Sequence, residues 1–244
     1  MGHTTGRRHL RRIAAPRAWP IPRKGSYWIV KQSPGPHTIE LSMPIALWIR
    51  DYLNYAKTMQ EVQYMLNNKK IYVDGKPIKD YKYPVGLFDV IYFPELNEYW
   101  RVLINRKGKL YLKQIDEEEA KIKPLRIKRK QIINGGKVQL TLFDGRNVVV
   151  EDPKKYKTGD TLVVNLEDKT IIDHLPMEKG VIIFFYYGAK VGTLGVLENI
   201  KTEHRSYGHT RFVVYRDYDT NEIKETVWEY AYVIGKDKPI ISVL

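Results

Sequence analysis

The side chains of this chain that could do chemistry are mainly cations, and they occur in clusters. Residues 1–39 contain no Asp or Glu, and aromatic residues such as Trp19, Tyr27 and Trp28 are interleaved with their Arg, Lys and His. Cations bind phosphates and aromatic rings stack on unpaired bases, so this combination predicts contact with a nucleic acid. We expect an extended basic arm that becomes ordered only when a polyanion neutralises its charge. The alternative is a floppy tail that happens to be basic. The arm residues predicted to make the contacts are Arg7, Arg8, His9, Arg11, Arg12, Arg17, Trp19, Arg23 and Lys24.

Two further groups of cations follow the arm. Those of residues 50–82 fall at positions that the apolar pattern leaves outside, and residues 121–130 contain a dense run of Lys and Arg. We interpret both groups as phosphate contacts, although a solvated basic surface is the alternative for each. The run comprises Lys121, Lys123, Arg126, Lys128, Arg129 and Lys130. The predicted contact residues in these two groups are Arg50, Lys57, Thr58, Lys69, Lys70, Lys76, Lys79, Lys82, Lys128, Arg129 and Lys130, and Lys190 is a further predicted contact outside them.

Composition supports a polyanionic partner. The chain has 244 residues, with 41 Lys and Arg against 28 Asp and Glu, a formal net charge of +13. Such an excess favours nucleic acid first and an anionic membrane second. The absence of cysteine excludes disulfides and thiolate metal sites. The longest apolar run, residues 181–187, is too short to cross a bilayer, and the basic N-terminus lacks the apolar core of a secretory signal. We therefore expect a soluble, cytoplasmic protein.

Residues 42–94 must position the second group of cations, and their pattern predicts two short helices followed by a hairpin. Ser42 is a good N-cap for the first helix, with a proline in its first turn. Thr58 and Glu61 have the spacing of a capping box for the second helix, which we expect to stop in a left-handed residue at 67–68. The dipeptide at 74–75 is Asp-Gly, which is a strong signal for a short hairpin turn.

The rest of the chain has the pattern of strands. We expect strands at 99–104 and 110–115, with a helix start at the carboxylates of 116–119. The spacing of turn residues after that predicts a small β-barrel with strands at 138–143, 148–150, 162–165 and 170–174. A third unit begins near residue 177, with strands at 181–187, 211–215, 225–228 and 232–234.

Three patterns could indicate catalysis or metal binding, but each has a simpler interpretation. The carboxylates of 116–119 point to different sides of a helix, so a helix start is favoured over a metal site. His204 and His209 have no further ligand set, so we expect a solvent loop that contacts nucleic acid with Arg205 and Arg211. The sequence Asp-Gly-Arg-Asn at 144–147 fits a hairpin turn. We predict no catalytic residue, no metal and no cofactor.

Residues 58–75 resemble the S4-like RNA-binding module of ribosomal proteins and RNA-modifying enzymes. Thr58, Glu61, the apolar pair at 65–66 and the Ile-Tyr-Val-Asp-Gly at 71–75 match at the spacing of that module. Two positions depart from it: Met59 stands where an arginine is common, and Lys69 where a glycine often ends the helix.

The chain also resembles the archaeal and eukaryotic small-subunit ribosomal protein family S4e, in order along nearly its whole length. The matching segments are residues 8–19, 33–37, 73–76, 80, 83–91, 135–140, 144–147, 156–160 and 233–236. Residues 188–197 resemble a KOW motif, an element of SH3-like β-barrels. None of these motifs is specific to the family alone, but their occurrence in the same order as in the family is specific.

This resemblance implies an α+β, multi-module fold: a basic N-terminal arm (1–41), an S4-like domain (42–94), a central β domain (95–175) and a KOW-containing SH3-like β-barrel (176–244). It implies a structural constituent of the small (30S) ribosomal subunit that binds and stabilises folded 16S rRNA. The expected partners are small-subunit rRNA and neighbouring ribosomal proteins, with no membrane and no small-molecule substrate. The alternative is an RNA-modifying enzyme or accessory with an S4-like module, and a DNA-compacting protein is a more distant one.

Overall fold

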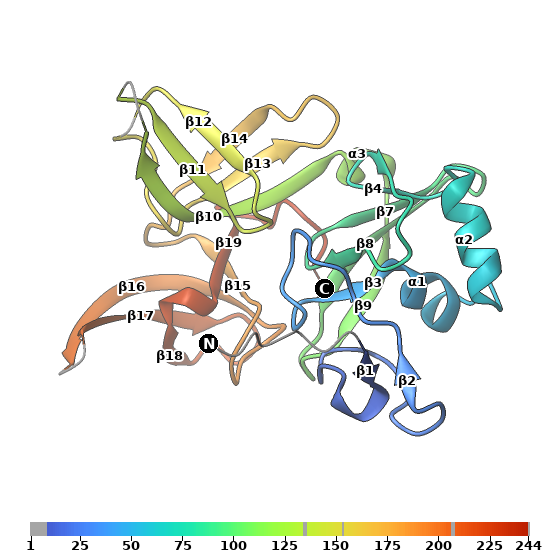
Figure 1. The fold of residues 1–244 in the computed structure, drawn as a ribbon. Helices are drawn as coiled ribbons and strands as arrows, with labels where there is room; N and C mark the ends of the chain where they lie inside the picture. The colour runs from blue at the N-terminus through green and yellow to red at the C-terminus, as the bar shows by residue number, and fades with distance from the viewer. Residues whose placement is uncertain (1–8, 134–135, 153, 206–207, 244) are drawn as a thin grey trace, which may run out of the picture. The chain divides into compact units, whose positions relative to one another are not determined.

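The computed structural model describes residues 9–133, 136–152, 154–205 and 208–243, with only the backbone of residues 204, 205, 208 and 209. The chain divides into two compact units (Figure 1). The first comprises Met1–Leu103 and Lys109–Gln114, and the second comprises Ile104–Gly108 and Ile115–Leu244.

The first unit is built on a five-stranded sheet in the order β5-β4-β7-β8-β9. These strands are β4 (Tyr72–Val73), β5 (Lys76–Pro77), β7 (Val90–Phe93), β8 (Glu98–Ile104) and β9 (Leu110–Ile115). Strands β8 and β9, which were expected near these positions, therefore extend the sheet of the S4-like segment. The domain boundary predicted after residue 94 is wrong in this respect, because the strands on both sides of it are hydrogen-bonded in one sheet.

The helix predicted to begin at Ser42 begins later. Residues Ser42–Pro44 form strand β3, which pairs with β6 (Pro84–Gly86), and the Ser42 hydroxyl donates to the carbonyl oxygen of Thr38 at 2.6 Å. Pro44 is extended, with ψ 138°, so α1 (Ile45–Leu47) starts only after it and continues as a π-helical turn over Trp48–Tyr52. The fully buried strand takes precedence over the capping signal, because burial of Met43 and its pairing outweigh a local preference.

The second helix and the hairpin follow the sequence more closely. Helix α2 (Met59–Asn67) has the predicted capping box: the Thr58 hydroxyl accepts from the Glu61 amide at 3.2 Å, and the Glu61 carboxylate accepts from the Thr58 amide at 3.4 Å. The left-handed residue after the helix is Lys69, with φ 55°, and not Asn68, so the predicted stop is displaced. Asp74 and Gly75 both have positive φ and close the β4–β5 hairpin, as the Asp-Gly dipeptide predicts.

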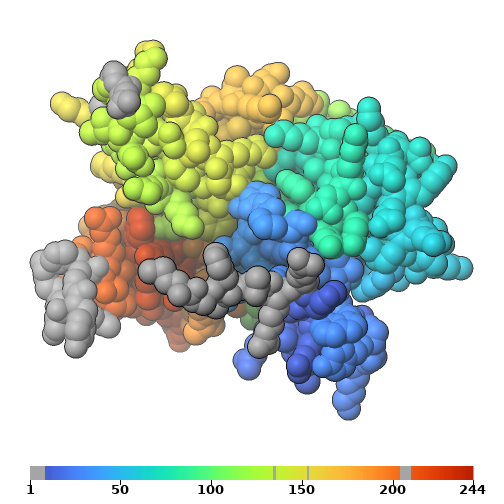
Figure 2. All heavy atoms as spheres, in the orientation of Figure 1, coloured from blue at the N-terminus to red at the C-terminus, as the bar shows by residue number. Residues whose placement is uncertain are grey.

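From residue 9 onwards the arm is folded as part of the first unit. Strand β1 (Leu10–Arg11) pairs with β2 (Trp28–Ile29), and the indole of Trp19 is fully buried and donates to the Ser42 carbonyl at 2.6 Å. Buried His37 lies 2.8 Å from the carboxylate of Asp89, at the start of β7. Figure 2 shows the described part of the arm in dark to mid blue. The structure departs from the prediction that the arm orders only on a polyanion, because Trp19 and His37 are buried with partners at Ser42 and Asp89, later in the chain.

The second unit contains two five-stranded antiparallel sheets. The first has the order β12-β11-β10-β13-β14, in which β10 (Ile122–Ile132) is the central strand. Its other strands are β11 (Val138–Leu142), β12 (Asn147–Val150), β13 (Thr161–Asn165) and β14 (Ile171–Leu175), close to the predicted positions. The one-turn helix α3 (Glu117–Ala120) starts at the carboxylates, as predicted. Leu125, Ile127, Leu140 and Leu162 lie in the core of this sheet.

The other sheet has the order β18-β17-β16-β15-β19. Its strands are β15 (Ile182–Phe185), β16 (Leu194–Arg205), β17 (Gly208–Asp217), β18 (Ile223–Val227) and β19 (Ala231–Gly235). The predicted strand at 225–228 ends one residue early, and a 3₁₀ turn over Trp228–Tyr230 leads into β19. The core of this sheet also includes Val163 and Leu175 of the preceding sheet, so the two sheets of the second unit share apolar contacts.

Candidate nucleic-acid interface

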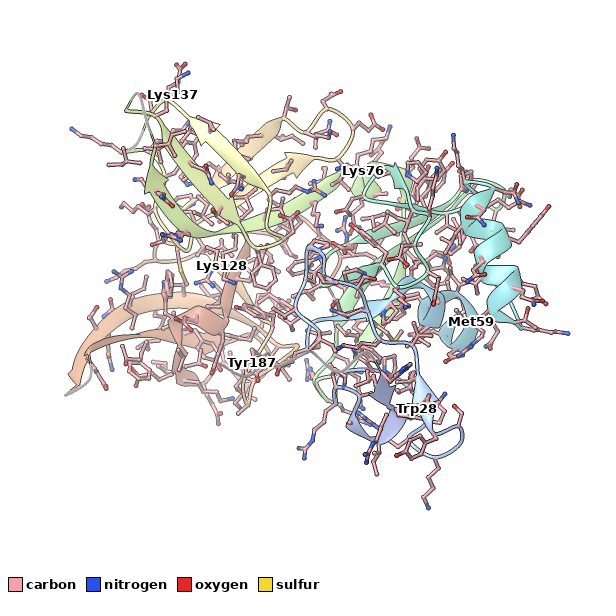
Figure 3. The ribbon with its side chains drawn as sticks, in the orientation of Figure 1. Trp28, Met59, Lys76, Lys128, Lys137 and Tyr187 are labelled. Carbon is pink, nitrogen blue, oxygen red and sulfur yellow. The ribbon has the colours of Figure 1, made fainter. Side chains whose placement is uncertain are left out.

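The arm presents an exposed aromatic and cationic surface. Tyr27 is 59% exposed and Trp28 is 52% exposed, and their rings meet edge to face with centroids 4.7 Å apart. His9 lies 5.4 Å from the Trp28 ring, and the Arg11 guanidinium lies 5.7 Å from the Tyr27 ring. Trp28 points away from the body of the unit (Figure 3). Exposed rings next to cations are suited to stacking on unpaired bases close to phosphates.

Other arm residues have structural roles that the sequence did not reveal. Arg12 donates to the Pro22 carbonyl at 3.0 Å, and Arg23 donates to the Pro16 carbonyl at 2.7 Å. Both guanidiniums therefore join separate parts of the arm by hydrogen bonds, and both side chains are half-buried. The predicted contact through Trp19 is wrong, because its indole is 0% exposed and has no face free for a base. Arg17 and Lys24 are exposed, while Arg7 and Arg8 lie outside the described residues.

The S4-like part of the first unit separates into exposed and paired cations. Arg50 is held by the Asp51 carboxylate at 2.6 Å, and this hydrogen bond raises the pKa of Arg50. Lys70 pairs with Glu95 at 2.9 Å, which raises the pKa of Lys70. Thr58 is occupied as the helix cap. Five predicted contact residues have exposed side chains: Lys57, Lys69, Lys76, Lys79 and Lys82.

Strand β10 divides its cations between the interior and the surface. Lys123 is 1% exposed and lies 3.8 Å from the Asp144 carboxylate, and Arg126 is 5% exposed. The prediction of phosphate contacts along the whole run is wrong for these two, because both side chains are enclosed by protein. Lys128 and Arg129 are exposed, and half-buried Lys130 donates to the Tyr156 carbonyl at 2.9 Å. Lys121 pairs with Glu117 at 3.4 Å.

The buried end of β10 is held by residues from the following sheet. The Tyr232 hydroxyl accepts from the Arg126 amide at 2.7 Å and donates to the Pro124 carbonyl at 2.9 Å. Burial raises the pKa of Tyr232 well above its ordinary value. The Arg126 guanidinium donates to the carbonyls of Glu229 and Trp228 and lies 4.4 Å from the centroid of the Trp228 ring. Burial lowers the pKa of Arg126.

A groove opens beside these contacts in the second unit, and the sequence did not predict it. It has a volume of about 580 Å³, and its lining includes Lys130, Lys157, Arg211 and Trp228. Its residues come from β10, β16, β17, the loop before β13, the segment after β14 and the turn after β18. Lys190, also predicted as a contact, is exposed on the loop between β15 and β16.

The patterns considered for catalysis have structural explanations where the structure describes them. Asp144 lies in the β11–β12 turn, where its buried carboxylate is 2.9 Å from the Arg146 guanidinium. Among the described residues there is no group of three His, Asp or Glu that could hold a metal ion, and no helix is both long and apolar enough to cross a bilayer. The side chains of His204, Arg205 and His209 lie outside the described residues, although their backbone belongs to strands β16 and β17 and not to a loop.

Comparison with known proteins decides the family. The chain is 53% identical to the small ribosomal subunit protein eS4 of Nanoarchaeum equitans over 199 residues, which cover 81% of this chain and 84% of that protein. It is 38% identical to the eS4 protein of Methanosphaera stadtmanae, with 100% of this chain and 99% of that protein covered. This chain belongs to ribosomal family S4e.

The family models place the S4e features along the chain. The model for ribosomal family S4e matches residues 96–171, the RS4NT (NUC023) domain matches residues 4–40, and the S4 domain matches residues 44–91. The crystal structure of the 30S ribosomal protein S4e from Thermoplasma acidophilum is also similar, with a TM-score of 0.70 at 30% identity; the match covers 82% of this chain and 99% of that one. The resemblance to family S4e and to the S4 module is therefore confirmed.

Proposed function

We propose that this S4e protein is a structural constituent of the small ribosomal subunit, where it binds and stabilises folded rRNA. The observation that carries the proposal is the similarity, over almost the full length, to proteins named as small ribosomal subunit protein eS4. The family is one of ribosomal structural proteins, so no catalytic role is assigned to the chain.

The exposed cations support binding through many weak contacts. They lie on the arm, on the S4 domain and on strand β10, as Lys76 and Lys128 illustrate in Figure 3. Each cation that meets a phosphate releases condensed counterions, and the individual contributions add up. The exposed rings of Tyr27 and Trp28 supply stacking surfaces for bases that are splayed out of a helix.

The finer organisation is part of the same proposal. The arm and the S4 domain would recognise the shape of an rRNA junction, since side chains do not enter the narrow major groove of A-form RNA. The central sheet, which we assign to a small β-barrel, and the last sheet, which we assign to an SH3-like β-barrel with a KOW element at 188–197, would extend the footprint. Neighbouring ribosomal proteins and 16S rRNA are the proposed partners in a cytoplasmic ribosome.

The proposal is tested by reversing charge on the S4 domain. The variant Lys76→Glu/Lys79→Glu/Lys82→Glu changes only exposed side chains. We expect its affinity for folded small-subunit rRNA to fall by about ten- to a hundredfold. The slope of log affinity against log salt should fall by about 0.7 to 0.9 for each phosphate that the variant no longer neutralises. Filter binding over a salt series measures both quantities.

The control is Lys154→Glu/Lys169→Glu/Lys179→Glu, which makes the same change in net charge at exposed positions of the second unit. An equal loss of affinity in both variants would mean that the lysines of the S4 domain act only through the net charge of the protein. Absence of the wild-type protein from salt-washed small subunits would contradict the proposed function itself. Deletion of residues 1–39 is a poorer test, because it removes buried Trp19 from the first unit.

A further inference from the structure

The groove of the second unit continues into a second hollow of about 500 Å³. The two hollows share Thr158, Arg211 and Trp228, and the second adds Lys128 to the cations of the first. Pockets of several hundred Å³ accept small organic ligands. The continuous groove therefore has room for part of an extended chain, and both hollows meet at Trp228.

The charge of this groove favours an anion. Lys128, Lys157 and Arg211 are exposed, and within the described part of the chain none of them forms an ion pair with a carboxylate. The groove also contains Asp160, but its buried carboxylate accepts from the Met177 amide at 3.0 Å and lies 2.9 Å from the His174 ring. Glu229 lines the second hollow and is the other carboxylate there. The cations that line the two hollows therefore outnumber the carboxylates.

Trp228 is a fixed aromatic surface inside this positive groove. The buried guanidinium of Arg126 lies 4.4 Å from its ring centroid, and Gly159 approaches the ring so closely that a Cβ there would lie 2.3 Å from it. The exposed Arg211 guanidinium lies 5.5 Å from the same ring, on a side chain that can move away. An aromatic ring next to exposed cations is the arrangement that single-stranded nucleic-acid sites use, with the base on the ring and the phosphates on the cations.

We infer that this groove binds an unpaired nucleotide of RNA, with the base packed on Trp228 and the flanking phosphates on Lys128, Lys157 and Arg211. Apolar side chains of Met177 and Ile200 line the groove and can cover the edge of a base or ribose. A base inside a helix is already stacked on its neighbours, so the site selects a bulge, a loop or a single strand. The inference rests on the proposed function, because it names which RNA element the second unit reads.

The test uses the full chain and a fluorescent decauridine, an oligonucleotide with little structure of its own. The variant Lys128→Glu/Arg211→Glu is expected to bind decauridine about tenfold or more weakly, with a salt slope lower by about 1.4 for two phosphate contacts. Its matched control is Lys169→Glu/Lys179→Glu, with the same charge change on exposed side chains of the same unit, and we expect a loss of about threefold or less. Trp228→Leu is expected to weaken binding about tenfold, whereas Trp228→Phe keeps most of it.

The outcomes separate this inference from the proposed function. Equal losses in the charge variant and its control would overturn the groove as a site, and so would full binding by Trp228→Leu. If the wild-type chain binds folded small-subunit rRNA but not decauridine, the inference fails and the proposed function stands. If the wild-type chain binds neither RNA, both fail. Thermal unfolding of each variant checks that it is folded. If Trp228→Leu does not fold, the charge variants still test the inference.

Discussion

The two halves of strand β10 have similar composition and opposite roles. In the first half, Lys123 and Arg126 are almost fully buried, and the segment pairs with β13. In the second half, Lys128 and Arg129 are exposed, and the segment pairs with β11. The register shifts between Ile127 and Arg129, so the strand changes partner and surroundings within a few residues.

The two halves show that, in a strongly basic chain, the number of cations in a segment does not locate a nucleic-acid interface. A buried cation is retained where carbonyls, a carboxylate or a ring surround it, and it contributes to folding. An exposed cation remains accessible to a binding partner. The arm repeats the pattern, since Arg12 and Arg23 bind its own carbonyls while Arg17 and Lys24 face solvent.

The strongest test of the difference between the two halves is to truncate one arginine in each of them. Arg126→Ala removes the hydrogen-bond donors to the Glu229 and Trp228 carbonyls, and it leaves a cavity beside the Trp228 ring. We expect the free energy of unfolding to fall by about 3–5 kcal/mol, as for other large-to-small changes at buried, hydrogen-bonded sites. Urea unfolding of the full chain measures this change.

Arg129→Ala is the matched control, because its side chain is exposed on the same strand. We expect a change within about 0.5 kcal/mol, which is usual for surface positions. A loss under about 1 kcal/mol for Arg126→Ala would mean that the cost of burying the charge offsets the free energy that its contacts contribute. The two halves of β10 would then differ in the burial of their cations but not in what those cations contribute to stability.

A second prediction concerns the point where β10 changes partner. Gly159 donates to the Ile127 carbonyl at 2.9 Å, has φ 100°, and lies against the Trp228 ring. Gly159→Ala would add both backbone strain and a clash with the ring, so we expect a loss of about 2–4 kcal/mol in the free energy of unfolding.

Gly180→Ala isolates the backbone part of this loss. Gly180 has φ 90°, but no atom lies within 4 Å of the position a Cβ would take. We expect it to cost only about 1–2 kcal/mol, the penalty for a left-handed alanine. Equal losses in the two variants, measured by thermal unfolding, would show that the Trp228 ring yields to the added methyl group and is not fixed.

Much of the fold could be predicted from local signals. The capping box at Thr58, the Asp-Gly turn at 74–75 and the helix start after Asp116 were predicted, because each depends on residues within a few positions of one another. Ser42 was predicted wrongly because a partner about forty residues away, β6, pairs with its strand. The arm was predicted wrongly for a similar reason: its fold depends on Trp19 and His37 being buried against later residues.

The candidate interface was less predictable than the fold. Lys76 could be named from the sequence because the apolar pattern leaves it outside, and Lys128 because it lies in a dense run of cations. The groove could not, since Lys130, Lys157, Arg211 and Trp228 come together only when two sheets pack. The one signal was the density of cations in residues 121–130, and periodicity did not show which of them point inward.

The smallest expected effect concerns the hydrogen bonds that hold the buried half of β10. Tyr232→Phe keeps the ring but leaves the Arg126 amide and the Pro124 carbonyl without the Tyr232 hydroxyl. We expect a loss of about 1–3 kcal/mol in the free energy of unfolding at pH 7, as for buried groups deprived of a partner. Tyr218→Phe, at a side chain that is 58% exposed, is the control and should stay within about 0.5 kcal/mol.

Raising the pH should reduce the difference between wild type and Tyr232→Phe. Burial raises the pKa of Tyr232 above its ordinary value of 10.0, so the folded state keeps a proton that the unfolded state releases. The stabilisation is fully present below pH 10.0 and is lost as the pH rises above it, by about 1.4 kcal/mol per pH unit for one proton. Wild type should therefore lose stability above pH 10.0 faster than Tyr232→Phe, in urea unfolding at pH 7, 10 and 11. Parallel losses in the two proteins would mean that other groups carry the alkaline sensitivity and that the Tyr232 hydroxyl reaches solvent.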